Sequence, residues 1–141
     1  MANSQAFATV AKVDALKAIA PNASTIKAAL YLASATTGAS NTAYTATGEV
    51  SGTNYTAGGV TVTHATAASS TGTTAFWTPS ASIVYTNVTL STAFDCVMLY
   101  DSSRTNATIS THTFGSQTVT AADFTLTMPT NDATTGLVRI A

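Results

Sequence analysis

The sequence has very few charged residues. Charged side chains make up 8% of its 141 residues, whereas about a quarter is usual in soluble domains. Five Lys and Arg residues against six Asp and Glu residues give a net charge of −1. This leaves no basic field to attract nucleic acid and little self-repulsion to keep copies of the chain apart. The composition therefore argues against a nucleic-acid partner and favours a protein whose surface is buried in an assembly.

Cysteine and long apolar runs are also scarce. Cys96 is the single cysteine, so no intrachain disulfide can form. It lies in the apolar run FDCVML without a basic neighbour that would activate the thiol, and we expect a buried, unreactive side chain. The N-terminus lacks a basic region followed by an apolar core, and no run approaches the length of a membrane span. We therefore expect neither a signal peptide nor a membrane partner.

Threonine is very frequent in this sequence, with thirty residues, whereas charged residues are few. Threonine is β-branched and favours strands, while the accompanying Ser, Asn and Gly residues favour turns. About seven to nine short strands at intervals of about eight to twelve residues are typical of β-sandwiches and jelly-rolls. The sequence thus predicts an all-β protein, with a single β-sandwich or jelly-roll domain over residues 22–141.

A short helix or arm is expected to precede this domain, over residues 1–21. Within it, residues 3–20 are the convincing helix candidate, because Phe7, Val10 and Leu16 recur at spacings close to the helical period. The following proline ends the pattern.

Strands are expected wherever apolar and polar residues alternate. Residues 24–34 alternate as a strand with one buried face would, although their Ala and Leu content leaves a helix open. FDCVMLYD, residues 94–101, is apolar on both faces and indicates a central strand covered on both sides. Further strands are expected in residues 41–63 (two short ones), 82–91, 107–114, 123–128 and 136–141, with a loop at residues 65–74 and a break at Gly115.

Four of the eight glycines fall within TATGEVSGTNYTAGGVTVT, residues 45–63. A phosphate-binding loop would place a lysine and a helix N-terminus next to such glycines. Here Glu49 is the only charged residue between residues 28 and 63, and its carboxylate would repel a phosphate. The stretch is therefore interpreted as turns, in which Gly58 and Gly59 supply the positive φ of a hairpin or bulge.

No pattern of catalytic or metal-binding residues is found. His64 and His112 lie between threonines without acidic or cysteine neighbours at ligand spacing, and a serine nucleophile would depend on one of them as its base. Asp95, Asp101 and Asp132 do not share a calcium-binding loop. We therefore expect a protein that is not an enzyme, with no catalytic residue, no cofactor and no metal.

The candidate interaction residues are aromatic, apolar or basic. Phe76 and Trp77 are expected to pack in the core or at an interface, with a sugar-binding platform as the alternative. The lysines of the N-terminal helix are expected to reach a neighbouring protein. The full set of expected interaction residues is Phe7, Val10, Lys12, Lys17, Phe76 and Trp77.

Two stretches of the chain resemble a known group of proteins. IKAALYLASATTGASNTAYTATGEVSGTNYTAGGVTVT and the later FGSQTVTAADFTLTMPTNDATTGLVRIA are similar to small virion proteins of tailed bacteriophages. The resemblance covers residues 24–141 and is most specific in TGEVSGTNYTAGG. The sequence departs from that group at Asn54, where a glycine is usual, and over residues 97–115, where the spacing is kept but the residues differ.

The resemblance implies a structural component of the virion, without catalytic residues. The form we expect is a capsid decoration or cement protein on the capsid exterior, made in the host bacterial cytoplasm. Its partners would be the major capsid protein and further copies of itself, as a homo-oligomer and specifically a trimer. A tail, fibre or head-tail component, or a carbohydrate- or receptor-binding β module, remains the alternative.

Overall fold

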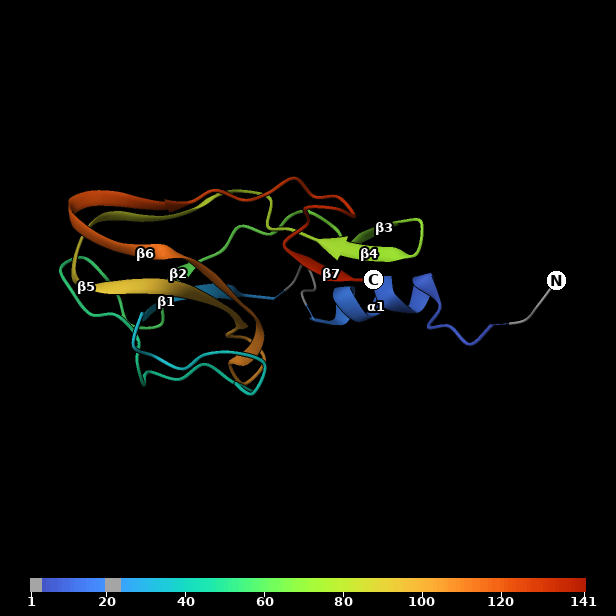
Figure 1. Ribbon diagram of the computed structural model, residues 1–141, viewed down its shortest axis with the longest axis horizontal. Coiled ribbons are helices and arrows are strands. Elements are labelled where there is room, and N and C mark those ends of the chain that lie inside the picture. The colour runs from blue at the N-terminus through green and yellow to red at the C-terminus, as the bar shows by residue number, and fades with distance from the viewer. Residues whose placement is uncertain (1–3, 20–23) are drawn as a thin grey trace.

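The computed structural model describes residues 4–19 and 24–141, and it is all-β apart from one short helix (Figure 1). The helix α1 spans Thr9–Ile19. The strands form two antiparallel sheets. The larger sheet has the order β2-β1-β5-β6, with β1 Ile26–Leu32, β2 Val60–Thr61, β5 Ile83–Asp101 and β6 Ala107–Leu126; the smaller has the order β3-β4-β7, with β3 Ser69–Thr71, β4 Thr74–Trp77 and β7 Val138–Ile140.

The long hairpin β5–β6 folds back on itself. Its strands pair along their whole length, but register shifts interrupt the ladder repeatedly between Tyr85 and Cys96. Such irregularities bend a strand and increase its twist. As a result, the two ends of the hairpin lie in separate layers (Figure 1). Phe94 packs between these layers, with its ring centroid 4.9 Å from that of Phe124 and 6.0 Å from that of Phe114.

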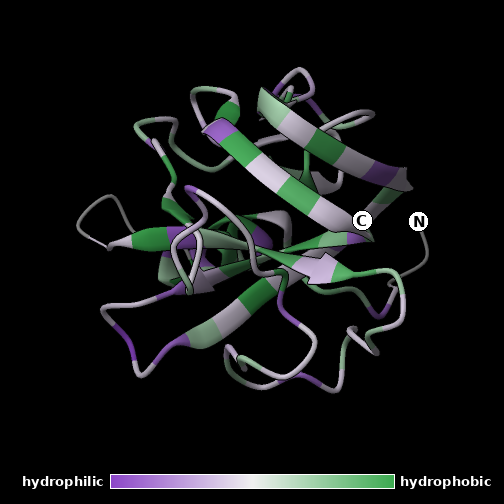
Figure 2. Cartoon of the chain, turned by 90° about the vertical axis from the view of Figure 1, so that its left-hand side faces the viewer, coloured by the Kyte–Doolittle hydropathy of each residue, from purple (hydrophilic) through white to green (hydrophobic). Residues whose placement is uncertain are grey.

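The second half of β5 is the centre of the protein, as its apolar sequence predicted. Val97 and Leu99 face the main core, whereas Cys96, Met98 and Tyr100 face a smaller cluster on the other side. All five side chains are buried. Figure 2 shows alternating bands of hydrophobic and paler residues along several strands.

Helix α1 packs on the smaller sheet. Leu16 is buried in the core, and the Lys12 side chain, 7% exposed, donates a hydrogen bond from Nζ to the carbonyl oxygen of Thr73 at 2.9 Å. The opposite side of the helix is open, because Phe7 just before it is 59% exposed and Val10 is 70% exposed. The helix is therefore anchored to the β structure by one face only.

Several expected boundaries are wrong. The helix begins at Thr9, later than the expected start, and the ends of the expected range 3–20 lie outside the described residues. The loop expected at residues 65–74 contains β3, since Ser69 and its neighbours pair with β4. The two strands expected at residues 82–91 and 94–101 are one continuous strand.

The glycine-rich region and the expected break in β6 also differ from the prediction. Within residues 41–59, only isolated bridges form, at Ala43, Glu49 and Thr53. β6 is continuous through Gly115, but its ladder with β5 shifts register at this place, because Phe94 pairs with Gln117 and Cys96 pairs with Thr113.

Replacing Phe94 by alanine tests whether the aromatic contacts hold the hairpin in its folded-back form. Because Phe94 is fully buried, Phe94→Ala should lower the free energy of unfolding by about 3–5 kcal/mol. The control Val84→Ala, at a side chain that is 42% exposed, should change it by less than about 1 kcal/mol. Chemical denaturation followed by circular dichroism measures both, and equal losses would contradict this account.

Candidate functional site

The glycine-rich stretch folds around the carboxylate of Glu49. Tyr44 donates its phenolic hydrogen to Oε2 at 2.6 Å, and Tyr55 donates to Oε1 at 2.8 Å. The backbone N–H of Gly58 donates to the same Oε1 at 2.7 Å. Hydrogen bonds to an ionised acceptor are about twice as strong as neutral ones. The turn therefore binds an internal anion, the carboxylate of Glu49.

Two further phenols, Tyr31 and Tyr100, fasten this loop to the strands, and a third, Tyr85, joins β5 to β1. Each donates a hydrogen bond to a backbone carbonyl: Tyr31 to Thr45 at 2.6 Å, Tyr85 to Ala28 at 2.8 Å and Tyr100 to Gly58 at 2.7 Å. The rings also stack in pairs, with centroids 4.8 Å apart for Tyr44 and Tyr100. The five tyrosines are spread from position 31 to position 100 of the sequence. In the structure all five lie around the Glu49 loop.

The glycines of this loop have the backbone conformation that the sequence predicted. Gly58 and Gly59 have φ angles of 88° and 75°. A Cβ atom on Gly59 would lie 1.7 Å from the carbonyl oxygen of Ala28, so the loop backbone lies directly against β1. Only glycine fits there on both grounds.

The tyrosines are held in their neutral form. Burial, together with a smaller contribution from the negative charge of Glu49, raises the pKa of Tyr31 to about 12. Burial is also the largest cause of the raised pKa of the other four phenols, and the charge of Glu49 contributes to each. These phenols are Tyr44, Tyr55, Tyr85 and Tyr100. At neutral pH these groups are hydrogen-bond donors, and the cluster acts as a structural clamp.

The aspartates and histidines considered as metal ligands or catalytic residues lie in different parts of the structure. Asp132 accepts hydrogen bonds at 2.7 Å from the backbone N–H groups of Thr134 and Thr135, which caps its own turn. Asp101 does the same with Ser103 at 2.9 Å. Over residues 4–19 and 24–141, no three His, Cys, Asp or Glu side chains gather where they could share a metal ion.

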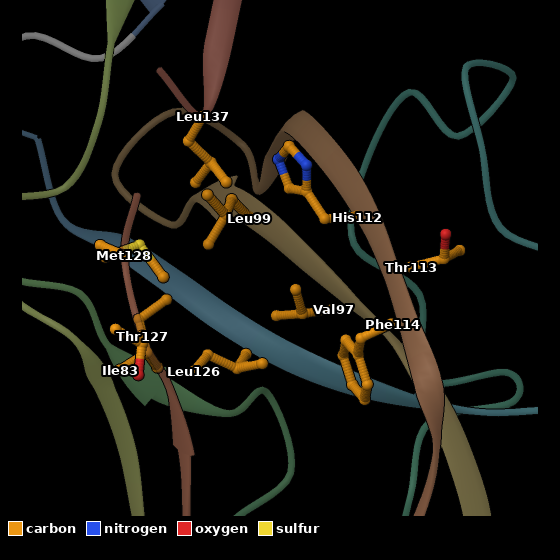
Figure 3. A pocket seen from close by; sticks show the side chains of 10 residues that line it. All are labelled: Ile83, Val97, Leu99, His112, Thr113, Phe114, Leu126, Thr127, Met128 and Leu137. Carbon is orange, nitrogen blue, oxygen red and sulfur yellow. The ribbon is translucent and has the colours of Figure 1, made fainter. Parts of the chain in front are cut away.

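An apolar pocket of about 150 Å³ lies between the two layers of the folded hairpin (Figure 3). His112 and Phe114 of β6 stand on one side, and Leu126 and the residues after it stand on the other. No lining residue carries a formal charge at neutral pH; the lining residues are Ile83, Val97, Leu99, His112, Thr113, Phe114, Leu126, Thr127, Met128 and Leu137. An apolar cavity of this volume accommodates a benzene ring.

The pocket histidine belongs to this apolar environment. Burial lowers the pKa of His112, so its imidazole is neutral at physiological pH. Its Nε2 lies 2.9 Å from the hydroxyl of Ser110. His64, the other histidine, lies elsewhere, with its ring 6.5 Å from that of Trp77. The pocket is therefore suited to an apolar group.

The expected interaction residues divide into buried and exposed ones. Phe76 and Trp77 are 5% and 1% exposed, and the indole Nε1 of Trp77 donates to the carbonyl oxygen of Thr66 at 3.0 Å. They offer no stacking face for a sugar. Lys12 is bonded inside the chain, whereas Lys17 is exposed and forms an ion pair with Asp14 at 3.4 Å. Phe7 and Val10 remain exposed, as described above.

Glu49→Gln tests the carboxylate clamp. Glutamine keeps the shape but presents an amide NH₂ group where one carboxylate oxygen accepted a hydrogen bond, so two donors face each other. We expect the free energy of unfolding to fall by about 1–3 kcal/mol. The control Asp14→Asn removes an exposed ion pair and should cost less than about 0.5 kcal/mol. Unchanged stability of Glu49→Gln in urea denaturation would show that the clamp is dispensable.

Alkaline titration tests the environment of the tyrosines. Their pKa values are raised in the folded state above the ordinary value of about 10, so the unfolded chain loses phenolic protons first as pH rises. Stability should therefore be complete below about pH 10 and decrease above it. Tyrosinate absorbance and circular dichroism, recorded together, should change over the same pH range. Ionisation of all five phenols near pH 10 with the fold intact would contradict this.

Comparisons with known proteins do not assign this chain to a family. No protein-family model matches it, and neither the curated proteins nor the solved structures gave a match. Among the described residues, no helix has the length and apolar character needed to cross a membrane. The function must therefore be inferred from the residues and contacts of the chain itself.

Proposed function

We propose that this chain is a non-enzymatic structural protein of a tailed-bacteriophage particle, and specifically a capsid decoration or cement protein on the outside of the shell. The observation that carries this proposal is the resemblance of residues 24–141 to small phage virion proteins. Its most specific part, TGEVSGTNYTAGG, is also the loop that closes around Glu49. A motif used entirely for holding the scaffold supports a structural role.

The mechanism in this proposal is the burial of uncharged surface. Residues 107–122, most of β6, contain no Lys, Arg, Asp or Glu, and many of their side chains are exposed. Burying such a surface against capsid subunits adds about 25 cal/mol for each Å² of apolar area removed from water, less the cost of ordering. Because the protein would bind the assembled shell and not free subunits, many modest contacts stabilise the particle by linkage.

The proposal also covers the finer architecture and the assembly. The two layers of the folded hairpin are assigned to the β-sandwich or jelly-roll class, with residues 1–21 as an arm. The chain is proposed to act as a homo-oligomer, with a trimer as the expected state and the major capsid protein as its partner. Phe7, Val10 and Lys17 are the exposed residues of the arm that would contact neighbouring chains, whereas Lys12 is used internally.

The copy number of the chain in purified particles tests the proposal. A cement protein should be present in a number comparable to that of the major capsid protein, because it covers the whole shell. Quantitative mass spectrometry of the particles, with labelled peptides of both proteins, measures this ratio. A few copies per particle would assign the chain to the tail or the head-tail connection, and its absence from the particle would overturn the virion assignment altogether.

A further inference from the structure

The outer edge of β6 is unprotected over most of its length. β6 lies at the end of the larger sheet, and β5 is its strand partner among the residues that the structure describes. Thr42 and Tyr44 form backbone hydrogen bonds with Thr108 and Asn106, at the start of the strand only. Edge strands are usually protected by lysine, proline or a covering segment. Residues 109–122 contain neither lysine nor proline. The register of β6 against β5 shifts near Gly115 and Ala121, but residues 110–113 pair regularly with residues 96–99, so this stretch leaves a regular edge that is receptive to another strand.

The apolar pocket reaches the surface beside this edge. Phe114, Leu126 and Met128 line the pocket and are each partly exposed. Figure 3 shows Phe114 on one side of the pocket and Leu126 and Met128 on the other, with β1 and β5 behind them. An unpaired strand edge next to an apolar pocket is the arrangement that binds an extended peptide, in which backbone hydrogen bonds supply affinity and one side chain fills the pocket.

The N-terminal arm of this chain has the properties of such a peptide. Residues 4–8, Ser-Gln-Ala-Phe-Ala, precede α1 and are not helical. They carry no charge, so no like charges would meet when they pair with the equally uncharged β6. Five extended residues span about 17 Å, enough to follow several residues of β6. Phe7 is 59% exposed, and its ring matches a pocket whose volume accommodates benzene.

The arm points away from the pocket of its own chain. In Figure 1 residues 4–8 lie at the end of the protein opposite the turn of the β5–β6 hairpin. Helix α1 is fixed to its own smaller sheet through Leu16 and Lys12. An arm held in this way is directed towards a neighbour, and the occupant of the pocket is therefore a second copy of the chain.

We propose that residues 4–8 of one copy add as a strand to the outer edge of β6 of a second copy and place Phe7 in the pocket between the layers of its hairpin. Each copy donates one arm and accepts another, so the contact is head-to-tail and forms a closed ring when the rotation between copies closes. A ring of three gives the trimer of the proposed function. The inference rests on the self-association in that proposal, but it does not depend on a phage shell.

Three variants of the full chain test the exchange. Phe7→Ser removes the inserted side chain, and Thr127→Trp fills the pocket opening from an exposed position. Each should raise the dissociation constant of the oligomer by a factor of about 10 to 100, as expected for one large apolar side chain. The matched control Val84→Ser removes another exposed apolar side chain and should leave the constant unchanged. Analytical ultracentrifugation measures all four proteins, with circular dichroism to confirm that each is folded.

A synthetic peptide of residues 2–10 supplies an independent readout. It should bind folded Phe7→Ser protein and shift the NMR signals of β6, whereas the same peptide with serine at position 7 should not. A wild-type protein that stays monomeric, or a Phe7→Ser variant that associates as tightly as the wild type, would overturn the inference. Both experiments use purified protein, so they remain decisive even if the chain proves to be absent from phage particles.

Discussion

The contact of Phe94 with Phe114 and Phe124 is the interaction on which most of the molecule depends. It holds the ends of one long hairpin in two layers, and the main core fills the space between them. The same geometry leaves β6 at the outside of both layers. The pocket and the open edge are therefore two consequences of one fold, because the layers are joined through β5 but remain uncovered at β6.

Several of the few charged side chains form hydrogen bonds within the chain that hold its segments together. Glu49 organises the glycine-rich loop, Lys12 fixes the helix to the smaller sheet, and Asp101 caps the turn between β5 and β6. The surface is left with threonine and serine hydroxyls and little net field. Little repulsion between like charges would oppose the contact of such a surface with another uncharged surface. The scarcity of charge thus links the way the chain folds to the way it would assemble.

Local patterns in the sequence predicted local structure well. The alternation in residues 24–34 located β1, and the continuous apolar run around Val97 located the buried strand. The expectation that β1 buries one face was wrong, because Ala29 and Tyr31 are buried in the smaller cluster on its other face. The glycine pair at Gly58 was assigned its positive φ, because that requirement is local. β3 was missed because a three-residue strand rich in serine has no periodic signal and depends on pairing with β4.

The candidate sites depended on contacts that a sequence pattern cannot show. Tyr31 and Tyr100 meet at the Glu49 loop from distant positions in the chain, and the bends in β5 that create the pocket arise from its pairing with β6. The alternation of apolar and polar residues in β5 and β6 indicated which side chains would be buried, but it did not indicate which layer of the folded hairpin they would belong to. Trp77 was correctly assigned to packing as the first alternative, and its burial follows from the pairing of β4 between β3 and β7.

A reconstruction of the phage particle at side-chain resolution tests the central claim most directly, since it locates both the chain and its arm. The account predicts rings of this chain on the outer surface of the shell, with Phe7 of each copy between β6 and residues 126–128 of its neighbour. Density for single copies, with an empty pocket and an arm that contacts no second copy, would contradict it.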